Sequence, residues 1–145
     1  MKKRAPTNLL CWLPVVVLCL AIFVQSCFPA TDAGPDFPMK DKLLHMAVYG
    51  LLAGLFSRAA RRTWGHRLTR LQLLAAGIGF ATFYGLSDEW HQAFVATRQA
   101  DVLDGVADFA GSVLGATIYA RLYLPKATRF PFPAAGDAED RRRNH

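Results

Sequence analysis

Residues 9–28 read LLCWLPVVVLCLAIFVQSCF, which is 20 residues without a charged side chain. As a helix this segment would be about 30 Å long at about 1.5 Å per residue, enough to cross the hydrocarbon core of a bilayer. Val102 to Leu124 is a second segment of this kind, with 23 residues and charges only near its ends. We therefore predict two membrane-spanning helices, although the mean hydropathy of the whole chain is only +0.17.

Two further apolar segments are shorter. Leu43 to Ser57 has 15 residues and Leu71 to Leu86 has 16, whereas a spanning helix needs about 17 to 25. Both reach that length only if their polar turns are included, as Asp41 to Arg58 with 18 residues and Leu71 to Gln92 with 22. The polar side chains would then lie at the membrane boundary, where an ionisable group is costly unless it is paired or functional. The alternative is that they merely extend to water.

Basic residues are distributed unevenly along the chain. Fourteen of the 17 Lys and Arg residues lie before the first segment, between Arg58 and Arg70, or from Arg121 to the end of the chain, and the others are Lys40, Lys42 and Arg98. Because short cytoplasmic loops are rich in Lys and Arg, four spans with both termini in the cytoplasm are predicted. The predicted fold class is therefore all-α, an integral membrane four-helix bundle with N- and C-termini inside. The pI of about 9.6 follows from this topology, and no nucleic-acid-binding module is recognisable.

The 145 residues suffice for one membrane unit without a separate soluble enzyme. Residues 1–28 are predicted to be an N-terminal transmembrane helix or signal anchor, residues 29–124 a membrane domain with three further helices, and residues 125–145 a cytoplasmic, disordered tail. The string from Val24 to Cys27 is similar to a bacterial lipoprotein cleavage sequence, and cleavage there would leave a lipid-anchored chain with three spans. Asp41 is expected to cap the second helix.

One stripe of the fourth helix changes from acidic to small residues. Asp101, Asp104, Asp108, Gly111 and Gly115 follow steps of three and four residues, so they share a face. The last two form a G-x-x-x-G pair, a pattern that lets another helix approach closely. The acidic residues should therefore be held near a neighbouring helix.

Polar faces occur on the second and third helices as well. His45 and Tyr49 are four residues apart on the second helix, and Asp88 and His91 share a face of the third, while Glu89 points elsewhere. A compact bundle would bring these faces together with the acidic stripe at the outer boundary of the membrane. We therefore predict an extracytoplasmic polar site.

The candidate residues of this site fall into two groups. The candidate catalytic residues are His45, Asp88, His91 and Asp104. The candidate substrate-binding residues are Asp41, Lys42, Tyr49, Glu89, Gln92, Arg98 and Asp108.

These side chains suit more than one kind of chemistry. A His beside a carboxylate titrates near neutral pH and can act as a general acid or base, whereas Ser87 lacks the surrounding motif of a nucleophile. Carboxylates with imidazole, such as Asp88 and His91 with His45 and Asp104, also form an acceptable donor set for a divalent metal. No H-E-x-x-H pattern occurs, and we expect no bound metal or other cofactor.

The order of these residues resembles a known family. The residues that carry the resemblance are Asp41-Lys42-x-x-His45-x-x-x-Tyr49, then Gly85-Leu86-Ser87-Asp88-Glu89-Trp90-His91-Gln92-Ala93-Phe94, then Arg98, Asp104 and Gly111. Together they resemble the VanZ-like family of small bacterial membrane proteins, named after a teicoplanin-resistance factor. The resemblance covers residues 41–116. It departs from the family at Ala96-Thr97, where Pro-Gly is frequent, and at Asp108, where Asn is common.

The resemblance implies a multi-pass protein of the bacterial cytoplasmic membrane that acts on the cell envelope and is linked to glycopeptide susceptibility. Three classes of function stay open: an enzyme acting on an envelope lipid or cell-wall precursor, with Lys42 and Arg98 holding phosphate; a non-catalytic protein that binds such a molecule, or a cationic ligand, through its acidic outer face; and a structural protein. In the structural case, pairs such as Lys42 with Asp88 or Arg98 with Asp104 would only fix the bundle. We favour binding or modification, because the carboxylates outnumber the cations. The sequence does not decide between enzyme and binder, and it leaves the oligomeric state open.

Overall fold

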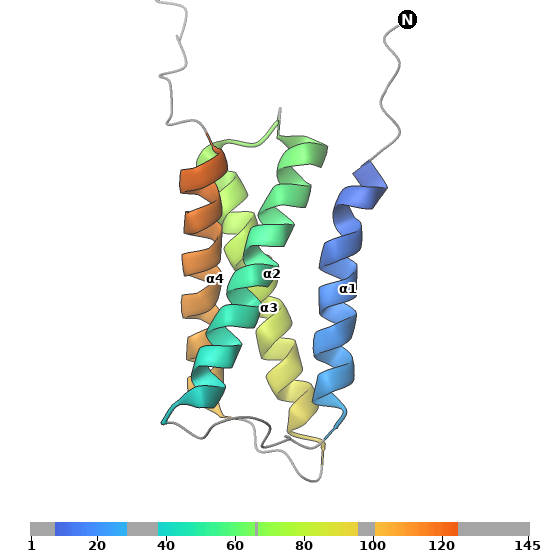
Figure 1. Ribbon diagram of the computed structural model, residues 1–145, viewed down its shortest axis with the longest axis vertical. Helices are drawn as coiled ribbons and strands as arrows, with labels where there is room; N and C mark the ends of the chain where they lie inside the picture. The colour runs from blue at the N-terminus through green and yellow to red at the C-terminus, as the bar shows by residue number, and fades with distance from the viewer. Residues whose placement is uncertain (1–7, 29–37, 66, 96–100, 125–145) are drawn as a thin grey trace, which may run out of the picture.

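The computed structural model describes residues 8–28, 38–65, 67–95 and 101–124. In these ranges the chain forms four α-helices and no β-strand: α1 (Asn8–Ser26), α2 (Lys40–Trp64), α3 (Arg70–Gln92) and α4 (Val102–Tyr123). The helices alternate in direction, so α1 begins and α4 ends at the same end of the molecule (Figure 1). The prediction of an all-α chain is confirmed for the described part, whereas the predicted tail, residues 125–145, lies outside it.

Helix lengths differ from those expected. α2 has 25 residues rather than 18, because the helix continues through Arg58, Arg61 and Arg62 to Trp64. In the described residues, α2 and α4 are long and apolar enough to cross a membrane, while the apolar part of α1, Leu10–Ser26, is shorter. The second helix therefore meets the length requirement more clearly than the first, the reverse of the sequence-based expectation. At about 1.5 Å per residue, α2 is roughly 37 Å long.

The starts of the helices show which side chains act as caps. Thr69 and Gln72 form a capping box at the start of α3, and Asp101 accepts a hydrogen bond from the backbone N–H of Leu103 at the start of α4. The cap of α2 is Met39, which has a positive φ of 64° and gives no side-chain hydrogen bond. The prediction that Asp41 caps α2 is therefore wrong. Asp41 lies in the first turn instead, where a negative charge interacts favourably with the positive end of the helix dipole.

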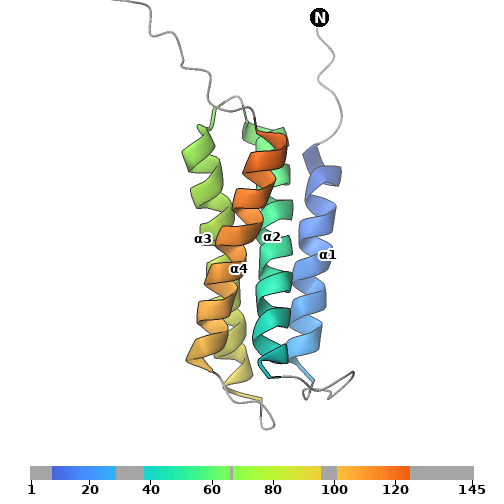
Figure 2. The ribbon, with the colours of Figure 1, turned by 60° about the vertical axis from the view of Figure 1, so that its left-hand side comes forward.

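α2 lies at the centre of the bundle and packs most extensively against α4. α1 packs on α2 and α3 and, in the described ranges, makes no contact with α4 (Figure 2). The backbones of α2 and α4 approach closely at glycines: a Cβ atom added at Gly111 would collide with the backbone of Met46, and one at Gly115 with the backbone of Gly50. The close packing expected of the G-x-x-x-G pair is therefore present, and its partner is α2.

Small side chains fill the interior, while large apolar side chains face outward. Ala53, Ala81 and Ala116 are fully buried, whereas Phe83 in the middle of α3 is 75% exposed and Leu20 in the middle of α1 is 58% exposed. A water-soluble bundle would bury its large apolar residues and pack them in its core. Helices that associate in a lipid environment instead pack through small residues.

The glycine contact between α2 and α4 can be tested by adding one methyl group. Gly115→Ala should lower the free energy of unfolding by about 1–3 kcal/mol, because the new Cβ meets the backbone of Gly50, which cannot move aside like a flexible side chain. Gly79→Ala is the matched control, since no atom lies within 4 Å of a Cβ added there. Thermal unfolding midpoints of the purified proteins in detergent would measure both effects. A Gly115→Ala protein as stable as the Gly79→Ala protein would contradict the close contact.

Candidate functional site

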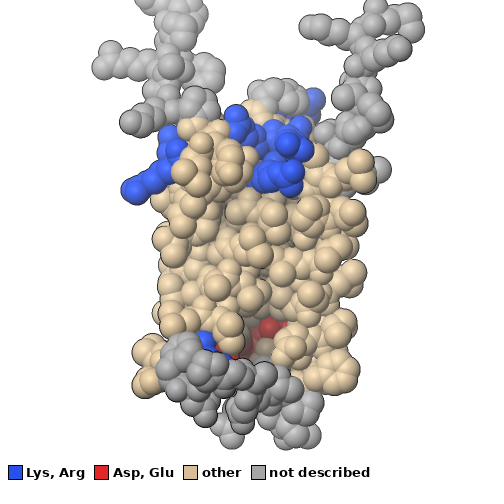
Figure 3. Space-filling view, in the orientation of Figure 1, with Lys and Arg blue, Asp and Glu red and all other residues tan. Residues whose placement is uncertain are grey.

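Charged side chains separate toward the two ends of the bundle. The acidic end is the end where α2 and α4 begin, and the basic end is the opposite one. Figure 3 shows most of the visible Lys and Arg side chains gathered at the basic end and acidic atoms in a hollow at the acidic end. The described residues of the acidic end that carry carboxylates are Asp41, Asp88, Glu89, Asp101, Asp104 and Asp108.

Lys42 joins α2 to the start of α4. Its ammonium group lies 2.6 Å from Asp101 Oδ2, forms a closer ion pair with Asp104, and is 3.8 Å from Asp41 Oδ2. The hydrogen bond from Lys42 lowers the pKa of Asp101. The suggested pairing of Lys42 with Asp88 is not the one that forms. A phosphate group held by Lys42 would have to displace these carboxylates.

His45 and Asp108 form a second link between α2 and α4. Nδ1 of His45 lies 2.8 Å from Asp108 Oδ1, and its Nε2 lies 4.0 Å from both Asp41 Oδ1 and Asp104 Oδ2. Gly85 of α3 makes room for this pair, because a Cβ atom there would lie 2.5 Å from Asp108 Oδ2. A carboxylate bonded to one ring nitrogen orients the imidazole and leaves the other nitrogen to accept or donate a proton.

Among the described residues, Asp88 is surrounded by uncharged donors rather than by cations. Tyr49 donates to its Oδ2 at 3.2 Å, Gln92 donates to the same oxygen at 2.8 Å, and Ser26 of α1 donates to Oδ1. The carboxylate therefore joins α1, α2 and α3. Ser26 was not predicted as a site residue; the only signal in the sequence was a hydroxyl near the end of an otherwise apolar segment.

Glu89 lies on the other side of α3 and faces α4. Its Oε2 accepts a hydrogen bond from the backbone N–H of Asp101 at 3.3 Å. In the described part of the chain, Oε1 is buried without a hydrogen-bond partner, as is Oδ2 of Asp108. Glu89 does point away from Asp88, as the helical spacing indicated, but this direction brings it toward His45 and Asp108.

The interacting polar side chains of α2, α3 and α4 at the acidic end, together with Ser26, form one polar cluster. Two of the predicted residues, His91 and Arg98, are not placed in this cluster by the described structure. His91 faces α1, with its ring centroid 5.2 Å from that of Phe23, and its Nδ1 is buried without a hydrogen-bond partner. Arg98 lies outside the described residues, so its suggested pairing with Asp104 stays a prediction. The catalytic role expected of His91 also stays a prediction.

A cavity of about 330 Å³ opens beside the cluster, between α1, α2 and α3. Its wall has a polar part and an apolar part, as an amphipathic molecule would require. The polar part consists of Gln25, Ser26, Asp41, His45, Tyr49, Asp88 and Gln92. The apolar part consists of Leu18, Ala21, Ile22, Leu44 and Val48.

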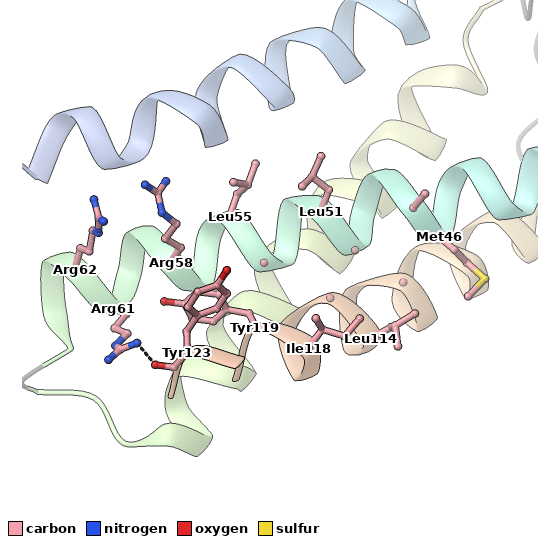
Figure 4. A pocket seen from close by; sticks show the side chains of 15 residues that line it. Met46, Leu51, Leu55, Arg58, Arg61, Arg62, Leu114, Ile118, Tyr119 and Tyr123 are labelled. Atoms are coloured by element: carbon pink, nitrogen blue, oxygen red, sulfur yellow. Dashed lines mark hydrogen bonds between the residues drawn. The ribbon is translucent and has the colours of Figure 1, made fainter. Parts of the chain in front are cut away.

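A larger groove of about 850 Å³ follows the contact between α2 and α4 (Figure 4). It is mostly apolar, and Arg58, Arg61 and Arg62 line it toward the basic end. Arg61 donates a hydrogen bond to the backbone carbonyl of Tyr123 at that end (Figure 4). None of the predicted site residues lines this groove, so the smaller cavity is the candidate site.

Residues 11–123 match the family described as VanZ/LLP1. The chain belongs to the VanZ/LLP1 family. The match includes α1, which the motif resemblance over residues 41–116 did not reach. Comparison with curated proteins found no match, and neither did comparison with solved structures. Family membership and the two long apolar helices fit a VanZ-like membrane protein.

The Lys42 ion pairs of this VanZ/LLP1 protein should contribute unequally to stability. Lys42→Met should lower the free energy of unfolding by about 3 kcal/mol, because it leaves the buried carboxylate of Asp104 without its cation. Asp101→Asn should cost far less, since that side chain is 43% exposed and water screens its charge. Denaturant titration of the purified variants would measure both losses. Equal losses would show that Asp104 does not depend on Lys42.

Proposed function

We propose that the protein is a multi-pass protein of the bacterial cytoplasmic membrane in which all four helices cross the bilayer and both termini lie in the cytoplasm. The separation of charge supports this orientation, because the Arg-rich connection between α2 and α3 lies at the basic end. Aromatic side chains near both ends are a second support: Trp64 lies at the basic end and the exposed Trp90 at the acidic end. The acidic end then faces the extracytoplasmic side.

We further propose that the acidic end binds or modifies an amphipathic component of the cell envelope, a membrane lipid or a lipid-linked cell-wall precursor. The observation that carries this proposal is the cavity, which joins an apolar wall from α1 and α2 to a polar wall containing His45, Tyr49 and Asp88. A lipid chain can lie along the apolar wall while its polar group reaches the carboxylate and imidazole.

Binding and modification would use different groups. Binding needs the hydrogen-bonding groups of Tyr49, Asp88 and Gln92, which are buried at the polar wall. Modification would in addition need a proton to move, and His45 oriented by Asp108 is the group best placed for this, since it lines the cavity. Asp104, near Nε2 of His45, would stabilise the protonated imidazole.

A purely structural role is the second candidate. It is favoured by the Lys42 and His45 pairs, which tie α2 to α4 with short contacts. Ion pairs of this kind can fix the arrangement of helices without any ligand. Asp88 distinguishes the two candidates, because it is a carboxylate among uncharged donors at the wall of a cavity.

Asp88→Asn should weaken retention of the envelope ligand without reducing the amount of protein in the membrane. The isosteric amide removes the negative charge from the polar wall, and Ser87→Ala is the matched control because Ser87 is exposed and donates only to the backbone of its own helix in the described structure. Mass spectrometry of lipids retained on purified protein would measure the effect. In cells, we expect expression to change teicoplanin susceptibility and Asp88→Asn to abolish that change. Loss of membrane abundance in parallel with the phenotype would favour the structural role.

Cysteine labelling would test the orientation. Phe94→Cys places a thiol at the acidic end and Arg67→Cys places one at the basic end, each in a protein whose Cys11, Cys19 and Cys27 are replaced by Ala. A membrane-impermeant maleimide should label position 94 in intact spheroplasts and position 67 only in inside-out vesicles. Labelling of position 94 from the cytoplasmic side would contradict the proposed topology.

A further inference from the structure

Three side chains from three different helices converge next to the cavity. His45 of α2, Glu89 of α3 and Asp108 of α4 each offer one ligand atom, and these atoms lie within 4.8 Å of one another. Ligands bonded to one cation at about 2.0–2.2 Å lie roughly 3–4.4 Å apart. If the three side chains each moved by less than about 1 Å, a single ion could bond to all three ligand atoms.

Two of these side chains have an oxygen atom with no hydrogen-bond partner among the residues that the structure describes. Glu89 is 8% exposed and Asp108 is 1% exposed, and Glu89 Oε1 and Asp108 Oδ2 are both buried without a hydrogen bond. An unsatisfied buried carboxylate oxygen is costly, so such atoms call for a donor or a cation. The oxygen of Asp108 is directed toward Gly85, one turn before Glu89 on α3. The free oxygen of Asp108 therefore faces α3, the helix that carries Glu89.

Charge around the three residues is also unbalanced in the described part of the chain. The ammonium group of Lys42 already pairs with Asp101 and Asp104. Among the described residues, the basic group in contact with Asp108 is therefore the imidazole of His45. Two buried carboxylates thus share one imidazole. A divalent cation would balance both of them while His45 stays neutral.

We propose that His45, Glu89 and Asp108 bind one divalent transition-metal ion of the Zn²⁺ or Mn²⁺ type. One imidazole nitrogen with two carboxylates favours such an ion over Mg²⁺ or Ca²⁺, which prefer oxygen ligands alone. This set differs from the donors suggested by sequence, Asp88 and His91 with His45 and Asp104. It also differs from the expectation of no bound metal.

A second group, Asp41, His45 and Asp104, has similar spacing. The ammonium group of Lys42 already lies against both of its carboxylates and would repel a metal ion there. The metal site deepens the proposed function and rests on it in one respect: the ion would meet the envelope ligand at His45, which lines the cavity. His45 would then act as a metal ligand in place of the proton-transfer role considered above.

Isothermal titration of the full-length protein in detergent with Zn²⁺, and separately with Mn²⁺, tests the inference. We expect one ion per chain and tighter binding of Zn²⁺ than of Mn²⁺. Glu89→Gln should weaken Zn²⁺ binding at least about tenfold, because it removes a direct metal ligand. Mutation of residues that merely orient the ligands already lowers metal affinity by about this factor. Asp88→Asn is the matched control: the same isosteric change at the neighbouring buried carboxylate should leave Zn²⁺ binding within about twofold.

Stability gives a second readout that does not depend on activity. Zn²⁺ should raise the thermal midpoint of the unmodified and Asp88→Asn proteins but not that of the Glu89→Gln protein. Absence of saturable Zn²⁺ or Mn²⁺ binding would overturn the metal site, as would equal weakening by Asp88→Asn and Glu89→Gln. Loss of lipid retention in Asp88→Asn with Zn²⁺ binding intact would support both proposals. Metal binding without any retained lipid would refute the proposed function alone.

Discussion

The close contact between α2 and α4 is the constraint on which the acidic end depends. Gly50, Gly111 and Gly115 allow the two backbones to touch, and a side chain at Gly111 or Gly115 would push them apart. Lys42 and His45 reach the carboxylates of α4 only because this distance is short. The small residues therefore do more than fill space. They determine whether buried carboxylates on one helix have partners on the other.

The carboxylates at the acidic end then divide into groups with different surroundings. Asp101 and Asp104 form ion pairs with the ammonium group of Lys42. These pairs offset the charge of the two carboxylates and connect α2 to α4. Asp88 is held by a hydroxyl, a phenol and an amide, none of which carries a charge. Among the described residues no cation pairs with Asp88, in contrast to Asp101 and Asp104. The proposed ligand and ion accordingly use Asp88, Glu89 and Asp108, the carboxylates with which Lys42 does not pair.

Helical spacing predicted which polar residues share a face of a helix, and the limits of such a prediction are physical. The steps of three and four residues placed Asp104, Asp108 and Gly111 on one face, and the structure brings that face against α2. Spacing does not tell which neighbour a face meets, because that depends on the rotation of each helix in the bundle. Glu89 follows Asp88 by one residue, about 100° around the helix, and so faces α4 while Asp88 faces α1 and α2.

The extent of α2 could not be read from hydropathy for a related reason. Polar residues such as Arg58 do not stop a helix, because Arg is a good helix former, so α2 continues well past its apolar stretch. The packing of α1 against the other helices could not be predicted from the sequence either, because it depends on contacts between particular pairs of residues. Ser26 bonds Asp88, and Tyr84 donates to the backbone carbonyl of Cys19. In a lipid environment apolar surfaces give helices little reason to associate, so polar contacts of this kind hold a peripheral helix in place. A ligand that bonds Asp88 would compete with Ser26 for the same carboxylate, and occupancy of the cavity would then be felt directly in the packing of α1.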